Sequence, residues 1–178
     1  MAPEQVLTTE QIFSGRGMSV RVDTVATASG RTTTREVVER NNAVCIIALD
    51  GNGQIVLERQ YRYSINQELL ELPAGMIEPG EKPEDCARRE LQEETGYLPK
   101  KLEEIGSWYV APGFCTEFMH LFLATDLVPS RLFAEDAEGI QVMRLKPEEC
   151  LELIGTGRIQ DGKTIAGILI YLHRTRAG

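Results

Sequence analysis

The pattern of hydrophobic and polar positions changes near residue 43. Residues 5–40 alternate in the manner of β-strands, with a Ser29-Gly30 turn before a strand over residues 32–38. Residues 44–49 form an unbroken apolar run, which is typical of a strand buried on both faces. The pattern predicts an N-terminal antiparallel β extension over residues 1–40 and an α/β domain over residues 41–178.

The α/β domain is expected to contain a mixed sheet. Its predicted strands cover residues 44–49, 54–63, 68–72, 102–110, 117–125 and 140–145. Its predicted helices cover residues 83–95, residues 147–155 and a segment after Asp161, the last with an apolar stripe formed by Ile165, Ile168, Leu169 and Leu172. Mixed strands with helices on both sides predict an α/β/α sandwich.

The helix expected over residues 83–95 carries a concentrated group of charges. Glu90 and Glu94 are one turn apart on one face, and Glu93 lies beside them. Arg89 can pair with Glu93 at i+4, which leaves Glu90 and Glu94 without a counter-charge. A divalent cation with oxygen ligands would resolve their repulsion, and Mg²⁺ is the usual one.

A solvated acidic helix face is the alternative interpretation of this segment. Ala87 and Leu91 lie on the same arc as the carboxylates. Since apolar residues turn that arc towards the core, the carboxylates are expected at the margin of the core. The apolar neighbours therefore favour a metal site.

The same stretch resembles the Nudix box. The resemblance rests on fixed residues at the spacing of that pattern, with Tyr97 as a mild departure: Gly75, Glu81, Arg89, Glu90, Leu91, Glu93, Glu94 and Gly96. It implies a Nudix-type α/β/α sandwich and hydrolysis of a diphosphate linked to a nucleoside. It also implies that the box glutamates hold a divalent metal, Mg²⁺ or Mn²⁺ in its place.

The flanking segments are similar to the ADP-ribose pyrophosphatase branch of that family. Pro112 follows Gly96 at the spacing of a proline in this branch, and residues 35–39, 59–62, 71–75 and 111–113 also match it. The implied reaction is water attack on one phosphorus of ADP-ribose, giving AMP and ribose 5-phosphate. GDP-mannose or a broader range of nucleoside diphosphate sugars stays open as substrate, and a non-catalytic ligand-sensing Nudix domain is the alternative from another class.

The resemblance assigns expected roles residue by residue. The implied metal ligands are the carbonyl of Ala74 with Glu90, Glu93, Glu94 and Glu138. The general base is expected among Glu135, Asp136 and Glu138, with Glu93 completing the acidic cluster and Arg89 orienting it. The implied substrate-binding residues are Arg35, Arg62, Pro112 and Glu117, although both arginines could equally be surface or ion-pair residues.

Composition limits the partners and the compartment. The formal net charge of −8 argues against a nucleic-acid partner, and no run is long and apolar enough to span a membrane. The 4 cysteines have no metal-knuckle or redox spacing, and no signal peptide is recognisable, so a cytoplasmic protein with free thiols is expected. Residues 5–40 have few large apolar side chains, and the resemblance implies a homodimer through these strands.

Overall fold

The structure is a computed structural model that describes residues 3–134 and 137–177 of the chain. It divides into two compact units. The first, the N-terminal unit, comprises Met1–Asn42 together with Trp108–Met119, and the second, the core unit, comprises Ala43–Ser107 and His120–Gly178.

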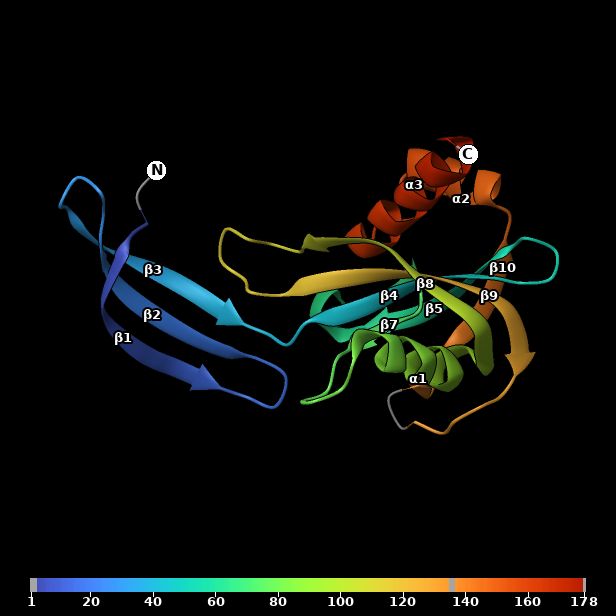
Figure 1. Ribbon diagram of the computed structural model, residues 1–178, viewed down its shortest axis with the longest axis horizontal. Helices are drawn as coiled ribbons and strands as arrows, with labels where there is room; N and C mark the ends of the chain where they lie inside the picture. Colours follow the sequence, from blue (N-terminus) through green and yellow to red (C-terminus); the bar gives the residue numbers. More distant parts are fainter. Residues whose placement is uncertain (1–2, 135–136, 178) are drawn as a thin grey trace. The chain divides into compact units, whose positions relative to one another are not determined.

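The N-terminal unit contains a three-stranded antiparallel sheet of β1 (Gln5–Ser14), β2 (Ser19–Ala26) and β3 (Thr32–Glu39), in that order (Figure 1). The turn between β2 and β3 places Gly30 at a φ of 80°, a left-handed conformation that glycine adopts without strain. The loop after Val110 adds to the β3 edge, because Val38 N donates to the Phe114 carbonyl at 2.7 Å and Thr116 N donates to the Val38 carbonyl at 3.0 Å.

The core unit is built on a seven-stranded mixed sheet. Its path is β10-β5-β4-β9-β8, while β6 pairs with β5 and β7 pairs with β4. The bounds are β4 (Ala43–Leu49), β5 (Ile55–Arg62), β6 (Gln67–Glu71), β7 (Ala74–Met76), β8 (Tyr97–Tyr109), β9 (Phe118–Pro129) and β10 (Gln141–Leu145). The short strand β7 was not among the predicted strands, and it pairs with β4, with Cys45 opposite Ala74.

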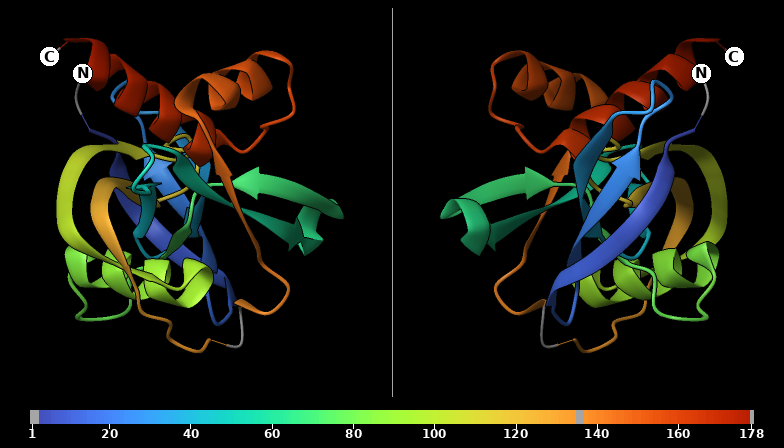
Figure 2. Two further views of the ribbon diagram at one scale, coloured as in Figure 1. Left: turned by 90° about the vertical axis from the view of Figure 1, so that its right-hand side faces the viewer. Right: turned by 90° about the vertical axis from the view of Figure 1, so that its left-hand side faces the viewer.

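Helices cover both faces of this sheet (Figure 2). Helix α1 (Pro83–Thr95) packs Ala87 and Leu91 against Val44 and Ile46 of β4. Helix α3 (Gly162–Ala177) covers the other face and α2 (Pro147–Gly155) packs on it. Gly167 permits close approach of α3, since a Cβ there would lie 2.7 Å from Leu72 Cδ1. The predicted α/β/α sandwich is confirmed.

One detail of α3 differs from the prediction. Leu169, assigned to the apolar stripe, is 45% exposed, whereas Ile168 and Tyr171 are buried. Thr164 completes the buried face one turn before Ile168. The stripe was placed too wide because the sequence does not show which apolar residue of the adjacent pair 168–169 faces the sheet. None of the helices among the described residues has the length and apolarity needed to cross a membrane.

Candidate active site

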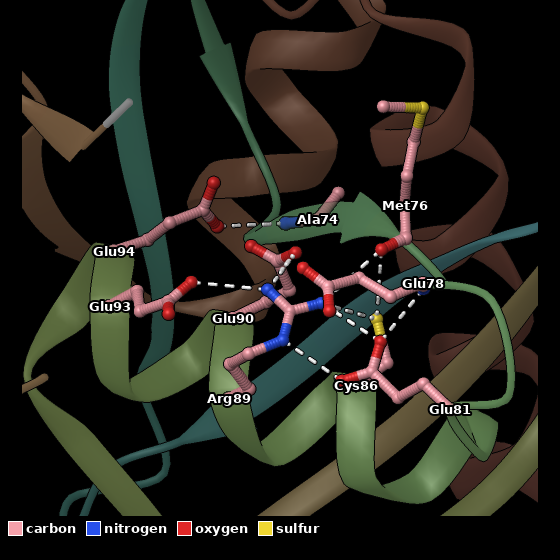
Figure 3. Close-up of polar contacts among 9 residues, drawn as sticks. All are labelled: Ala74, Met76, Glu78, Glu81, Cys86, Arg89, Glu90, Glu93 and Glu94. Carbon is pink, nitrogen blue, oxygen red and sulfur yellow. Dashed lines mark hydrogen bonds and ion pairs between the residues drawn. The ribbon is translucent and has the colours of Figure 1, made fainter. Parts of the chain in front are cut away.

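Helix α1 begins and ends where the sequence predicts. Pro83 occupies its first turn, and Gly96 closes it at a φ of 80°, donating its N–H to the Gln92 carbonyl at 3.1 Å. Cys86, Ala87 and Leu91 are buried. With this face fixed on the sheet, four charged residues of α1 lie beside β7 and the loop that follows it: Arg89, Glu90, Glu93 and Glu94 (Figure 3).

The Arg89 guanidinium joins three carboxylates of this site. It donates to Glu90 Oε1 at 2.6 Å, to Glu93 Oε2 at 3.1 Å and to both oxygens of Glu81, at 2.9 and 3.0 Å. The hydrogen bonds that Arg89 donates to Glu81 are the main reason why the pKa of Arg89 is raised. The expectation that Glu90 has no counter-charge was wrong, because the five donors of a guanidinium let Arg89 reach Glu90 and Glu93 together.

Gly75 makes room for the Glu90 carboxylate. A Cβ on Gly75 would lie 1.9 Å from Glu90 Cδ and 1.9 Å from Glu90 Oε1, so the carboxylate rests directly against the β7 backbone. Burial raises the pKa of Glu90 in spite of the Arg89 charge beside it. The Glu90 side chain can therefore occupy this position only because residue 75 is a glycine.

Glu94 lies one turn further along and is only 8% exposed. Its Oε2 accepts a hydrogen bond from Ala74 N at 3.0 Å, and no cationic side chain of the described residues lies within ion-pair distance of it. Burial raises the pKa of Glu94 well above its usual value, and the nearby charges of Glu58 and Glu90 raise it further. Glu94 is thus a buried carboxylate that lacks a cation.

Glu58 of β5 is a residue of this region that sequence reasoning missed. It is 0% exposed, and neither carboxylate oxygen has a hydrogen-bond partner among the described residues. Burial raises its pKa to about 7. The sequence feature that could have indicated Glu58 is its place directly after the apolar run Ile55-Val56-Leu57, a strand position where a solvated charge is not expected.

A second missed group surrounds Glu71, which is 1% exposed. Arg62 donates to both of its oxygens, each at 2.7 Å, and Lys163 from the start of α3 also pairs with it. Lys163 further pairs with Asp161 at 3.0 Å. Burial opposes the charge of Glu71, but the bonds from Arg62 and the charge of Lys163 outweigh it and lower the pKa of Glu71. Arg62, expected to bind substrate, therefore already pairs with a buried carboxylate.

The other predicted substrate residues lie in the N-terminal unit. Arg35 and Pro112 line the same hollow of about 310 Å³, together with Asp23 and Phe114. Arg35 donates there to both oxygens of Glu4, at 3.0 and 2.6 Å. Glu117 is 9% exposed and lies 3.8 Å from Arg40.

The predicted residues therefore form one group in each unit. Arg35, Pro112 and Glu117 belong to the N-terminal unit, and the Ala74, Arg89, Glu90, Glu93 and Glu94 group belongs to the core unit with Arg62. Glu138 is exposed in the segment that precedes β10, and Glu135 and Asp136 lie outside the described residues.

The donor set of the core unit fits a divalent cation. Within residues 3–134 and 137–177, no three acidic, His or Cys side chains already converge on one metal position. The available donors are nonetheless oxygens, as hard cations prefer, and Glu58 and Glu94 are buried acids without a cation. A bound divalent cation would supply the positive charge that this region lacks.

Comparison with known proteins identifies the family. Residues 39–167 match the model of the NUDIX domain, and the chain belongs to the Nudix hydrolase family. Members of this family that act as pyrophosphatases generally need a divalent metal. The match begins at the last residue of β3, ends in the first half of α3 and includes the whole of α1.

Individual relatives cover nearly the whole chain. The ADP-ribose pyrophosphatase of Bacillus subtilis is 37% identical over 93% of this chain and 90% of its own length. The methanol dehydrogenase activator of Bacillus methanolicus is 38% identical with the same coverage. A GDP-mannose pyrophosphatase of Citrobacter koseri is 37% identical over 78% of this chain and 77% of its own length.

A solved structure supports the fold independently. The crystal structure of an ADP compounds hydrolase superposes with a TM-score of 0.91 and covers 99% of this chain and 96% of its own. Because the identity is 21%, this likeness concerns the fold alone.

Proposed function

We propose that the protein hydrolyses the diphosphate bond of nucleoside diphosphate sugars, with ADP-ribose as the main substrate and AMP and ribose 5-phosphate as products. The observation that carries the proposal is the pair of α1 carboxylates, the partly buried Glu90 and the buried Glu94, set against Ala74 and Gly75 of β7. The pair stands in the intact box of a Nudix hydrolase. ADP-ribose is proposed because the relative from Bacillus subtilis carries that name.

The cation is proposed to be Mg²⁺, with Mn²⁺ as a substitute. The Ala74 carbonyl and the carboxylates of Glu90, Glu93, Glu94 and Glu138 would hold it. When bound, it would withdraw negative charge from the diphosphate oxygens and make a water molecule more acidic. Arg89 keeps Glu90 and Glu93 in place through its hydrogen bonds to both.

The proton of the attacking water would pass to a carboxylate of the segment before β10. Glu138 is the proposed base, and Glu135 and Asp136 are the alternatives. The exposure of Glu138 supports this role, since an exposed carboxylate can approach a substrate that enters from solvent. General-base assistance of this kind typically contributes about 10²–10⁴-fold in rate.

Substrate binding is proposed to use Arg35, Arg62, Pro112 and Glu117. Arg35 is 48% exposed in its side chain and holds a carboxylate, Glu4, with two hydrogen bonds. A guanidinium that binds a carboxylate in this way can bind a phosphate with the same fork geometry.

Residues 1–40 are proposed as the dimerisation extension and residues 41–178 as the hydrolase domain.

GDP-mannose is the second candidate substrate, favoured by the relatives named GDP-mannose pyrophosphatase. Separate incubations with ADP-ribose, GDP-mannose, NADH and ATP in Mg²⁺, followed by chromatography, would discriminate. We expect AMP from ADP-ribose to exceed the other products. Turnover of GDP-mannose alone would contradict the substrate assignment, and no turnover of any compound in Mg²⁺ or Mn²⁺ would contradict the hydrolase assignment.

The protein is further proposed to be a cytoplasmic homodimer that pairs through its N-terminal strands. Large apolar side chains on and after β1 support this, because Val6, Ile12, Phe13 and Met18 are 46–56% exposed. Free Cys45, Cys86, Cys115 and Cys150 fit a reducing compartment. Light scattering should give twice the monomer mass at micromolar concentration, and a monomer would contradict the dimer.

A further inference from the structure

Glu58 faces helix α1 from the middle of the sheet. Val56, two residues earlier on β5, packs in one cluster with Ala87 and Leu91 of α1. Side chains two apart on a strand point to the same face, so Glu58 points towards α1 as well. Glu94 is the acid of α1 that interacts with it.

The Glu58 carboxylate has no ion pair or hydrogen bond with a described residue, and the charges of Lys163 and Arg62 act on it only from a longer distance. Among residues 3–134 and 137–177, neither buried oxygen has a hydrogen-bond partner, and the acidic neighbour Glu94 accepts a hydrogen bond from Ala74 N. Two ionised carboxylates have no proton to donate to each other. Burying a charge in this way is unfavourable unless a cation or a donor joins it.

The cations of this region are already committed. Arg62 and Lys163 pair with Glu71, which is directly opposite Glu58 on β6, and Lys163 also pairs with Asp161. When all four are ionised, the carboxylates of this group outnumber its two cations by two: Glu58, Glu71, Glu94 and Asp161 against Arg62 and Lys163. A divalent cation beside Glu94 has the charge that balances the group.

We propose that Glu58 is a positioning residue of the divalent-cation site, which acts through Glu94. When the cation is bound, the Glu58 carboxylate adds a negative charge behind Glu94 and so strengthens the attraction of the site for a divalent cation. The inference rests on the proposed function, because that function places the cation at Glu94. A purely structural Glu58 would instead change the stability of the metal-free and metal-bound protein equally.

The test uses the Glu58→Gln variant of the full chain and Mn²⁺ as the probe, without substrate. Titration calorimetry or the electron paramagnetic resonance of free Mn²⁺ gives the affinity, and thermal unfolding is measured in EDTA and in saturating Mn²⁺. We expect the Mn²⁺ affinity to fall by about 10–100-fold, as is typical for residues that support metal ligands. We also expect the Tm in EDTA to be equal to or above that of the unmodified protein.

A second variant tests whether the loss of charge alone explains the effect, and a control variant tests the same chemical change at an exposed position. Glu58→Met has a similar length, lacks the charge and suits an apolar strand, so it should weaken Mn²⁺ binding in the same way. Glu68→Gln makes the same chemical change at an exposed position of β6 and should leave both the affinity and the Tm unchanged. Mn²⁺ affinities of both Glu58 variants within twofold of the unmodified protein would overturn the inference.

A Glu94→Gln variant distinguishes a failure of the proposed role of Glu58 from a failure of the proposed cation site. If it loses Mn²⁺ affinity while the Glu58 variants keep it, the inference about Glu58 fails and the proposed function stands. If Glu94→Gln binds Mn²⁺ as the unmodified protein does, the cation site is placed wrongly and both fail.

Discussion

The contact between Gly75 and Glu90 allows a sharp test of the site, the Gly75→Ala substitution. The added Cβ would lie 1.9 Å from Glu90 Cδ, so the carboxylate must retreat by about 1.6 Å to reach an ordinary carbon–carbon separation of ~3.5 Å. The φ of Gly75 is not positive, so alanine brings no backbone strain, and the effect isolates the displaced carboxylate.

A displacement of this size should lower the catalytic rate strongly and the stability of the fold only slightly. Misplacing a catalytic group by about 1 Å can lower the rate about 10²-fold, equivalent to about 2.7 kcal/mol in the activation free energy. Arg89 keeps its bonds to Glu81 and Glu93, so we expect the Tm to change by only a few degrees.

The assay compares kcat/KM for ADP-ribose in saturating Mg²⁺ with thermal unfolding of the same samples. Gly51→Ala is the matched control, because a Cβ there meets no atom within 4 Å and the φ is also not positive. In the double variant with Glu90→Ala, the Gly75 change should add almost nothing, since its target is gone. Full activity of Gly75→Ala, or an additive loss in the double variant, would refute this reasoning.

Three further predictions follow from the buried charges. Glu94→Gln should stay folded by circular dichroism yet lose Mg²⁺-dependent turnover by at least ~10²-fold; full turnover would argue against its role as a ligand. Glu71→Gln should lower the free energy of unfolding in urea by about 3–5 kcal/mol, because it leaves Arg62 and Lys163 poorly paired, and an unchanged midpoint would contradict this. The pKa of Glu58 is raised from 4.5 to about 7, so the folded metal-free protein holds this proton more tightly than the unfolded chain. The free energy of unfolding in EDTA should therefore fall by up to about 3 kcal/mol as the pH rises from 4.5 to 7, and the Tm should fall with it. The Glu58→Gln variant should show a weaker pH dependence.

The sequence was most informative where local patterns determine the structure. The bounds of α1 follow from Pro83 and Gly96, and the buried strand β4 follows from an unbroken apolar run. The face of α1 that carries the acids follows from the positions of Ala87 and Leu91. Each of these features depends on residues that are close together in the chain.

The sequence was least informative about contacts between distant segments. Lys163 reaches Glu71 across 92 positions of the chain, and no local pattern near either residue indicates the pair. The electrostatic interaction between Glu58 and Glu94 likewise depends on which face of β5 meets α1. The reach of Arg89 to Glu90 depends on side-chain conformation, which the spacing of residues does not determine.

The central claim is that the box carboxylates support metal-dependent water attack on a diphosphate. The most direct test is hydrolysis of ADP-ribose in ¹⁸O-labelled water with Mg²⁺, followed by mass spectrometry of AMP and ribose 5-phosphate. We predict one ¹⁸O atom in one of the two phosphate products, with no product in EDTA. Undiminished turnover in EDTA, or products that carry no label, would contradict the account.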